Sequence, residues 1–335
     1  TNDFPSFIVD KNKINIEFLI LILWTKEFLD FAQQWSSWTT WRQRVDMNVF
    51  LNTKIPLPNL TEQNRIVEEY NKKLDDSWNA EKKALKLEKE IESYLMEELG
   101  IEVKENKNWN KGLQIVEFSK IETWGASKIM LSNNNFKSSF HKMIKLWEYF
   151  ELVRWVTYSK DSELNEWWYK VLRANNISLG WNINYDELKY ISDIKEKFDV
   201  KRKLKKNDLF ICLASWSKDH IGKVAYIEDD IDYYFWWFMW AIRQISCWIS
   251  PMYLFHMLNS KLFNKYLSDR IFWVNINNLN SELLYNFSFP LPPLEIQEKI
   301  VKHIWNLKEE IKSLKKLSED LKESAKVEFE REIFS

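Results

Sequence analysis

The side chains that could do acid–base, nucleophilic or metal chemistry are few in this chain, and they do not cluster. Four histidines are scattered without the spacing of a metal site: His141, His220, His256 and His303. The carboxylates at Asp229–Asp232 are typical of an acidic loop. Cys212 and Cys247 make neither a disulfide framework nor a CxxC pair. The residues therefore predict no catalytic centre and no metal site.

Motifs that bind a cofactor are missing as well. The sequence holds no GxGxxG motif, no phosphate-binding GxxxxGK[ST] loop, and no Asn-Pro-Pro-aromatic run of the kind that holds a flipped adenine. We expect the chain to bind no cofactor and not to be an enzyme.

The charge of the chain is nearly balanced, with a formal net charge of −1. Acidic residues concentrate around 62–105 and 295–332. Between these stretches lies a basic run: Lys195, Lys197, Lys201, Arg202, Lys203, Lys205 and Lys206. Phosphate binding requires only a local basic face, whatever the net charge. The run is therefore either such a face, contacting phosphate rather than bases, or a solvated loop.

The sequence favours a cytoplasmic protein. No stretch approaches the roughly 20 apolar residues of a membrane span, and the first residues lack the layout of a secretory signal. The chain begins at Thr1 rather than Met, which we interpret as a processed or truncated start.

Tryptophan is unusually frequent and glycine unusually rare, at 19 and 5 residues. Several tryptophans lie among small polar residues, as in Ser37–Trp41 and Ala214–Ser217, where turns normally use glycine. We hypothesise that many of these positions are encoded by UGA codons that the cell reads as glycine. UGG codons at Trp38, Trp168 and Trp237 would contradict this hypothesis.

One segment occurs twice at a constant offset, as Ile55–Val67 and as Phe289–Val301. Both copies contain Pro-Leu-Pro, then a glutamine, then Ile-Val. Upstream, Leu23–Phe28 resembles Leu258–Phe263 at nearly the same offset. Repeats of this kind decide the architecture. The chain is expected to hold the tail of one unit and the whole of the next.

A long helical pattern follows each Pro-Leu-Pro, because the prolines keep a helix from starting earlier. The second copy has a coiled-coil seam at Ile300, Ile304, Leu307, Ile311, Leu314, Ser318, Leu321 and Ala325. The first copy is weaker, with Lys73 in the seam. Each helix of about 35–40 residues would span roughly 50–60 Å. We expect the two helices to pack against each other, and dimerisation of a single helix is the alternative.

The remaining segments predict an α+β protein, in which a mixed α/β domain accompanies the two long helices. Strands are predicted at 209–213, 223–227 and 113–118, and a short helix at 251–267. The expected organisation is a remnant of a first domain at 1–54, a spacer helix at 55–100, a connector at 101–139, a complete domain at 140–288 and a distal spacer helix at 289–335.

Together these features resemble the specificity subunit of type I restriction–modification systems. Beside the two Pro-Leu-Pro segments, the resemblance is carried by Leu204–Ile211, Ser217–Ala225 and Asn275–Leu279. Turn glycines of the family correspond here to Trp147, Trp155, Trp216, Trp236, Trp237, Trp240 and Trp273. The resemblance covers nearly the whole chain and lacks most of one domain, so it indicates an N-terminally truncated member.

The resemblance implies two target-recognition domains joined by two long antiparallel coiled-coil helices. Each domain would read one half of a split site in double-stranded DNA, and the length of the helices would set the gap. Two methyltransferase subunits would bring S-adenosylmethionine, and restriction/translocase subunits would bind the resulting assembly. Catalysis would belong to these partners.

If the chain reads DNA, its contacts should come from basic, amide and hydroxyl side chains on turns. The candidates are Arg42, Arg44, Ser159, Lys160, Arg173, Asn175, Asn176, Ser217, Lys218, His220, Arg243, Asn275 and Asn277. We favour Arg173 for a base contact and Lys218 for a phosphate contact.

Two other functions remain open. The chain could be a coiled-coil adaptor that binds only proteins, and a salt-dependent DNA gel shift separates this from DNA recognition. It could also be a stand-alone methyltransferase, for which the isolated chain would have to bind S-adenosylmethionine.

Overall fold

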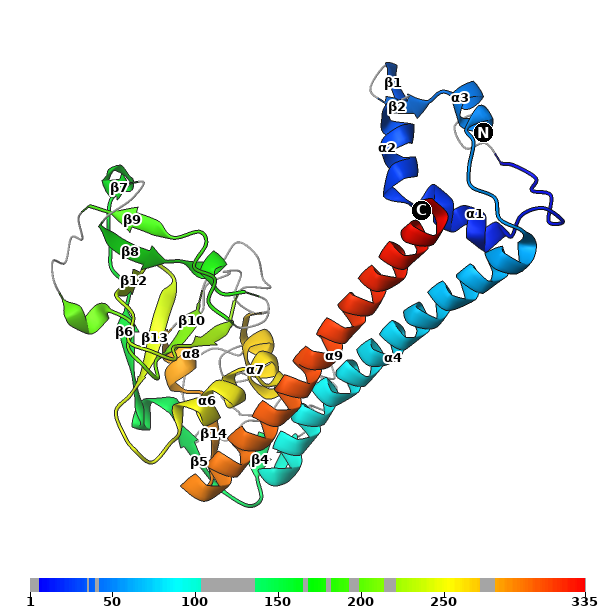
Figure 1. The fold of residues 1–335 in the computed structure, drawn as a ribbon. Helices are drawn as coiled ribbons and strands as arrows, with labels where there is room; N and C mark the ends of the chain where they lie inside the picture. Colours follow the sequence, from blue (N-terminus) through cyan, green and yellow to red (C-terminus); the bar gives the residue numbers. More distant parts are fainter. Residues whose placement is uncertain are drawn as a thin grey trace, which may run out of the picture. The chain divides into compact units, whose positions relative to one another are not determined.

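The computed structural model describes residues 6–34, 36–39, 42–103, 136–164, 168–178, 182–192, 199–213, 221–271 and 281–334. The strand predicted at 113–118 lies outside these residues. The chain divides into two compact units (Figure 1): a first unit of residues 1–89 and 307–335, and a second unit of residues 90–306. None of the described helices is long and apolar enough to cross a membrane.

The first unit places short elements beside the two long helices. These elements are α1 (Ile16–Leu23), α2 (Lys26–Gln34), α3 (Met47–Asn52) and the antiparallel hairpin of β1 (Ser36–Thr39) and β2 (Arg42–Val45). Helix α1 starts at Asn15 because its side chain accepts hydrogen bonds from the backbone N–H groups of Glu17 and Phe18. Phe18 then packs with Ile66 and Phe329 in a small core.

The long helices are α4 (Leu60–Glu98, 39 residues) and α9 (Leu294–Phe334, 41 residues). In the first unit their ion pairs join early residues of α4 to late residues of α9. Arg65 meets Glu332 at 2.6 Å, and Lys83 meets Glu310 at 2.8 Å. In the second unit, Glu98 meets Lys299 at 2.8 Å. This order confirms the predicted antiparallel pairing.

The helix seam contains polar residues that the pairing accommodates. Ser77 and Ser318 are both buried, and their hydroxyl oxygens lie 2.8 Å apart across the seam. Lys73, which weakened the predicted seam, forms an ion pair with Glu328. A polar pair of this kind favours one register, because any slip would bury each hydroxyl without its partner.

The glutamine of the first Pro-Leu-Pro segment fastens α4 to the start of α1. Gln63 is fully buried. Its Oε1 accepts a hydrogen bond from the Asn15 N–H at 2.8 Å, and its Nε2 donates to the carbonyls of Lys13 at 3.1 Å and Pro58 at 2.7 Å. The side chain therefore holds the helix start against the N-cap of a neighbouring helix.

The second glutamine makes the same three bonds in the second unit. Gln297 is also fully buried. Its Oε1 accepts from the Ser250 N–H at 2.8 Å, and its Nε2 donates to the carbonyls of Trp248 at 3.0 Å and Pro292 at 2.8 Å. Ser250 is the N-cap of α6 (Pro251–Leu258). The sequence repeat is thus a repeat of three-dimensional structure.

The second unit contains two four-stranded sheets (Figure 1). One is antiparallel, with the order β11 (Val224–Tyr226), β10 (Leu209–Cys212), β13 (Met239–Gln244), β6 (Phe150–Arg154). The other has the order β12 (Tyr233–Phe235), β8 (Tyr169–Leu172), β9 (Lys189–Ile191), β7 (Glu163–Leu164), and its β12–β8 pair is parallel. The predicted strands at 209–213 and 223–227 are confirmed by β10 and β11.

Strand β10 lies between two hydrophobic cores. Leu209 and Ile211 face a core shared with α6, whereas Phe210 and Cys212 face a core shared with Leu172 of the other sheet. Successive side chains of a strand point to opposite faces. A continuous apolar run such as this one is therefore what a strand covered on both faces requires.

The prediction of a single helix at 251–267 is wrong, because the structure has two helices there, α6 and α7 (Lys261–Ile271). Ser260 interrupts them: its hydroxyl donates to the carbonyl of Met257 at 2.6 Å and accepts from the Phe263 N–H at 3.4 Å. The carboxylate of Glu92 accepts from the Lys261 N–H at 3.0 Å. These groups cap the start of a new helix.

Short pieces complete the second unit. They are α8 (Ser281–Tyr285), the antiparallel pair β14 (Ser288–Leu291) with β5 (Lys142–Lys145), and the antiparallel pair β3 (Ile101–Val103) with β4 (Phe136–Ser138). Between α4 and β3, Gly100 has a φ of +57°, and a Cβ there would lie 2.7 Å from the ring of Phe140.

Candidate nucleic-acid interface

The guanidinium of Arg173 forms no hydrogen bond with a described residue. This residue follows β8, and its side chain is half-buried. Its Nε is buried without a hydrogen-bond partner, and its guanidinium makes no ion pair with any described residue. Buried polar groups are almost always paired, so an acceptor for this N–H is expected from water or a ligand.

Glu163 on β7 lies near three positively charged side chains, one of which is Arg173. The ammonium of Lys189 donates to its carboxylate at 2.7 Å. This bond, together with the charges of Lys189, Arg173 and Lys160, holds the pKa of Glu163 below its usual value. The structure thus brings two predicted residues, Arg173 and Lys160, around one carboxylate.

Tyr158 lies next to Glu163 and Arg173. Its hydroxyl lies 3.5 Å from the Glu163 carboxylate, and its ring packs on Trp236 with centroids 5.4 Å apart. Burial, followed by the charge of Glu163, raises the pKa of Tyr158 to about 12. The phenol is therefore neutral at physiological pH and can donate or accept a hydrogen bond.

Two other predicted residues of this region are exposed. The hydroxyl of Ser159 lies 2.9 Å from that of Ser162. The Nδ2 of Asn175 donates to the Glu187 carboxylate at 2.9 Å. Both side chains keep unused hydrogen-bonding capacity toward solvent.

Asn176 is at odds with its predicted role as a DNA contact, because it is 1% exposed and its amide bonds to the protein. Amide residues in turns serve either a ligand or the turn itself. The sequence alone does not separate these two uses, since the acceptors of the Asn176 amide, the carbonyls of Asn184 and Glu187, come from a later segment of the chain.

Arg243 is likewise committed to the protein. Its Nε and one terminal nitrogen donate to the carboxylate of Asp208 at 2.9 and 2.7 Å. It also donates to the backbone carbonyls of Lys201 at 2.7 Å and Lys203 at 2.8 Å. The Asp208 side chain is 2% exposed. The Arg243 guanidinium therefore has few free N–H donors for a base. It holds the basic residues Lys201 and Lys203 against β13 instead.

The basic segment, defined by Lys201–Lys206, faces the predicted acidic loop. Lys203 pairs with Asp232, and the backbone N–H of Lys206 donates to Asp230 at 2.9 Å. The Lys206 ammonium lies 3.8 Å from Asp229. These carboxylates partly neutralise the cations, so the segment offers less charge to a phosphate than its sequence predicts.

The structure does not describe the side chains of the other predicted residues. Ser217, Lys218, His220, Asn275 and Asn277 lie outside the described residues, as do Lys195 and Lys197 of the basic run. Arg42 and Arg44 lie on β2, without described side chains. Their roles stay predictions.

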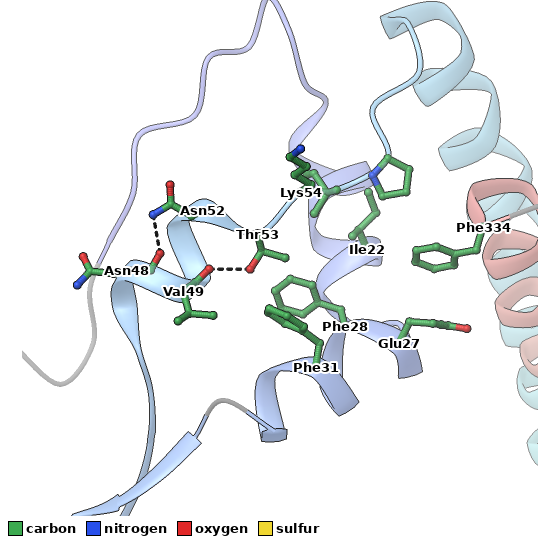
Figure 2. A pocket seen from close by; sticks show the side chains of 12 residues that line it. Ile22, Glu27, Phe28, Phe31, Asn48, Val49, Asn52, Thr53, Lys54 and Phe334 are labelled. Atoms are coloured by element: carbon green, nitrogen blue, oxygen red, sulfur yellow. Dashed lines mark hydrogen bonds between the residues drawn. The ribbon is translucent and has the colours of Figure 1, made fainter.

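The first unit contains a pocket of about 750 Å³ (Figure 2). Phe28 and Phe31 line it together with Phe334. The charged residues of its lining are Glu27 and Lys54. The hydroxyl of Thr53 points back to the Val49 carbonyl at 2.7 Å. Such a lining suits apolar packing and carries no catalytic constellation.

The repeat relates this pocket to the core of the second unit. Phe28 and Phe31 of α2 correspond to Phe263 and Tyr266 of α7, which are buried in the core of the second unit. Leu146 belongs to the same core and donates its N–H to the Phe287 carbonyl at 3.0 Å. The pocket is thus lined in part by the counterparts of residues that are buried in the second unit.

The chain is similar to known proteins both in sequence and in fold. Residues 141–323 match the family described as the type I restriction modification DNA specificity domain. The StySPI type I restriction enzyme specificity subunit of Salmonella potsdam is 29% identical over 167 residues, which are 49% of this chain and 35% of that protein. A putative type I restriction enzyme MjaX specificity subunit of Methanocaldococcus jannaschii is 30% identical over 162 residues, 47% of this chain and 37% of that protein.

The match thus spans about a third of the length of these curated relatives. Among solved structures, one from work on complex assembly and conformational transition of the type I R-M system superposes with a TM-score of 0.60. The alignment covers 96% of this chain and 72% of that one, at 16% identity. This similarity concerns the fold.

Proposed function

The chain belongs to the family of type I restriction–modification DNA specificity domains, and we propose from this premise that it is the DNA-recognition subunit of a type I restriction–modification complex. In this role it binds double-stranded DNA in a sequence-dependent way and carries out no chemistry itself. Methyltransferase subunits with S-adenosylmethionine, and restriction/translocase subunits, supply the catalysis in the cytoplasm.

The observation that carries the proposal is the uncommitted guanidinium of Arg173. A guanidinium can donate two parallel hydrogen bonds to O6 and N7 of a guanine in the major groove. Arg243 in the same unit is paired four times within the protein, whereas Arg173 is paired with no described residue. The described residues provide no acceptor for the Arg173 guanidinium, and in the proposed complex the DNA bases provide it.

The surroundings of Arg173 support this assignment. Lys160 and Ser159 are exposed beside it and suit phosphate contacts. Glu163 and Tyr158 add an acceptor and a neutral hydroxyl for base edges. Lys218 and the other candidates outside the described residues are proposed as DNA contacts from the sequence alone.

The duplicated glutamine arrangement supports a bipartite target. Each unit holds a Pro-Leu-Pro segment and a buried glutamine that starts a long helix in the same way. We propose that each copy belongs to one recognition domain, that each domain reads half a site, and that the helices set the spacing. The helix pair is also the proposed docking surface for the partner subunits.

Substitution of Arg173 tests the proposal. Arg173→Ala should relax preference at one base position by about 1–3 kcal/mol, the range for a bidentate guanine contact. The measurement is competition binding with duplexes substituted at each position, at several salt concentrations. Because the base contact is lost and phosphate contacts remain, the salt dependence should hardly change.

Two results would contradict the proposal. If the wild-type protein gives no salt-dependent gel shift on any duplex, the chain is an adaptor rather than a DNA reader. If Arg173→Ala weakens all sequences equally, Arg173 contacts phosphate and the base-reading assignment is wrong.

A further inference from the structure

Asn176 connects the turn that carries Arg173 to a neighbouring segment. We propose that it is a positioning residue for base recognition, whose buried amide fixes where the Arg173 guanidinium meets the DNA. This inference rests on the proposed function and adds a residue that acts through Arg173 without touching DNA.

Asn176 holds the backbone of Arg173 from both sides. Its Oδ1 accepts the Arg173 N–H at 2.8 Å, and its own N–H donates to the Arg173 carbonyl at 3.0 Å. These bonds close the 3-10 turn Ala174–Asn176 onto Arg173. The backbone of Arg173 cannot rotate unless they break.

The same amide anchors the turn to a later segment. Nδ2 of Asn176 donates to the carbonyl of Asn184 at 2.9 Å and to that of Glu187 at 3.4 Å. The carbonyl of Asn176 accepts the Asn184 N–H at 2.7 Å. Since Glu187 lies just before β9, the turn is tied to the sheet that also carries Glu163.

This bracing matters because the Arg173 head group has no partner of its own. A bidentate contact needs its donors held within a fraction of an ångström, usually by packing and hydrogen bonds behind them. Here no described residue bonds to the guanidinium. The position of the side chain therefore depends on the backbone from which it projects, and Asn176 fixes that backbone.

The test compares Asn176→Ala with a matched control, Gln244→Ala. The Nε2 of Gln244 donates to the carbonyls of Ser246 and Ile249, both at 2.6 Å, in the same unit but away from the Arg173 turn in sequence. Each variant removes a side-chain amide that bonds two backbone carbonyls. Both should lower stability, so loss of stability alone does not support the proposal.

Base preference separates the two variants. The complex of the chain with its methyltransferase subunits is measured by competition with duplexes substituted at each position. Asn176→Ala should reduce discrimination at least about 5-fold at the position that responds to Arg173→Ala, while Gln244→Ala leaves it unchanged. In the Arg173→Ala background, Asn176→Ala should add no further loss at that position, because both act through one contact.

Each remaining outcome decides against one of the two claims. Additive losses, or unchanged preference with Asn176→Ala, would overturn the positioning role while Arg173→Ala still shows its effect. No response to Arg173→Ala at any position would overturn the base contact itself. If Asn176→Ala does not fold, Asn176→Asp keeps the acceptor for the Arg173 N–H, loses the donor to the two carbonyls, and is expected to shift the same position.

Discussion

Arg173 follows strand β8 and Arg243 lies within strand β13, and the structure gives the two arginines different roles. Arg243 lies against a carboxylate that is 2% exposed, whereas the Nε of Arg173 lies buried without a partner. The sequence predicted both as DNA contacts, because turns and charge are local properties. The pairing of Arg243 with Asp208 joins distant parts of the chain, and no local pattern predicts it.

This difference predicts unequal effects on stability. Arg243→Met should lower the free energy of unfolding by about 3–5 kcal/mol, because it leaves the buried Asp208 carboxylate without its counter-ion. Arg173→Met should change it by less than about 1 kcal/mol, since no described pairing is lost. Chemical denaturation of the two variants provides the comparison. Equal effects would mean that the ion pair contributes no more than an ordinary surface charge.

The tryptophans bear on the recoding hypothesis in two ways. Non-glycine residues with positive φ in the described chain are Asn207 and Phe238, so no described tryptophan adopts the backbone conformation reserved for glycine. Exposure nevertheless favours the hypothesis, because none of the described tryptophan side chains is buried, although tryptophan is usually among the more buried residues. The exposed ones are Trp24, Trp78, Trp147, Trp168, Trp237, Trp248 and Trp305.

At the scale of elements, the sequence predicted the two long helices, their seam and the central strands. These features depend on patterns within one segment, such as the alternating steps from Ile300 to Ala325. It did not predict the break between α6 and α7, because Glu92 of a distant helix helps to cap α7. Nor did it predict that the repeated glutamine joins two helices, since two of the three partners of each copy lie 47 to 50 residues upstream.

The glutamine arrangement predicts a specific loss. Gln297→Leu should lower the free energy of unfolding by about 1–3 kcal/mol, because the buried Pro292 carbonyl and the partly buried Ser250 N–H and Trp248 carbonyl lose this partner. The amide protons at the start of α6 should also exchange faster with solvent. Glu298→Gln, at the exposed neighbouring position, is the control and should have little effect. Unchanged stability and exchange would show that the three hydrogen bonds contribute nothing to the junction.

For the molecule as a whole, family membership and fold agree with a recognition role. The second unit, with its two sheets, carries Arg173, Lys160 and Glu163 close together. The first unit repeats the glutamine arrangement with Gln63.

The most direct test of DNA recognition is the pattern of methylated DNA in the cell. The genome of the source strain is compared with that of a strain lacking this gene, with the genes of the partner subunits left intact. The account predicts that one methylated sequence motif disappears when the gene is removed and returns when it is restored. An identical set of methylated motifs in both strains would contradict it.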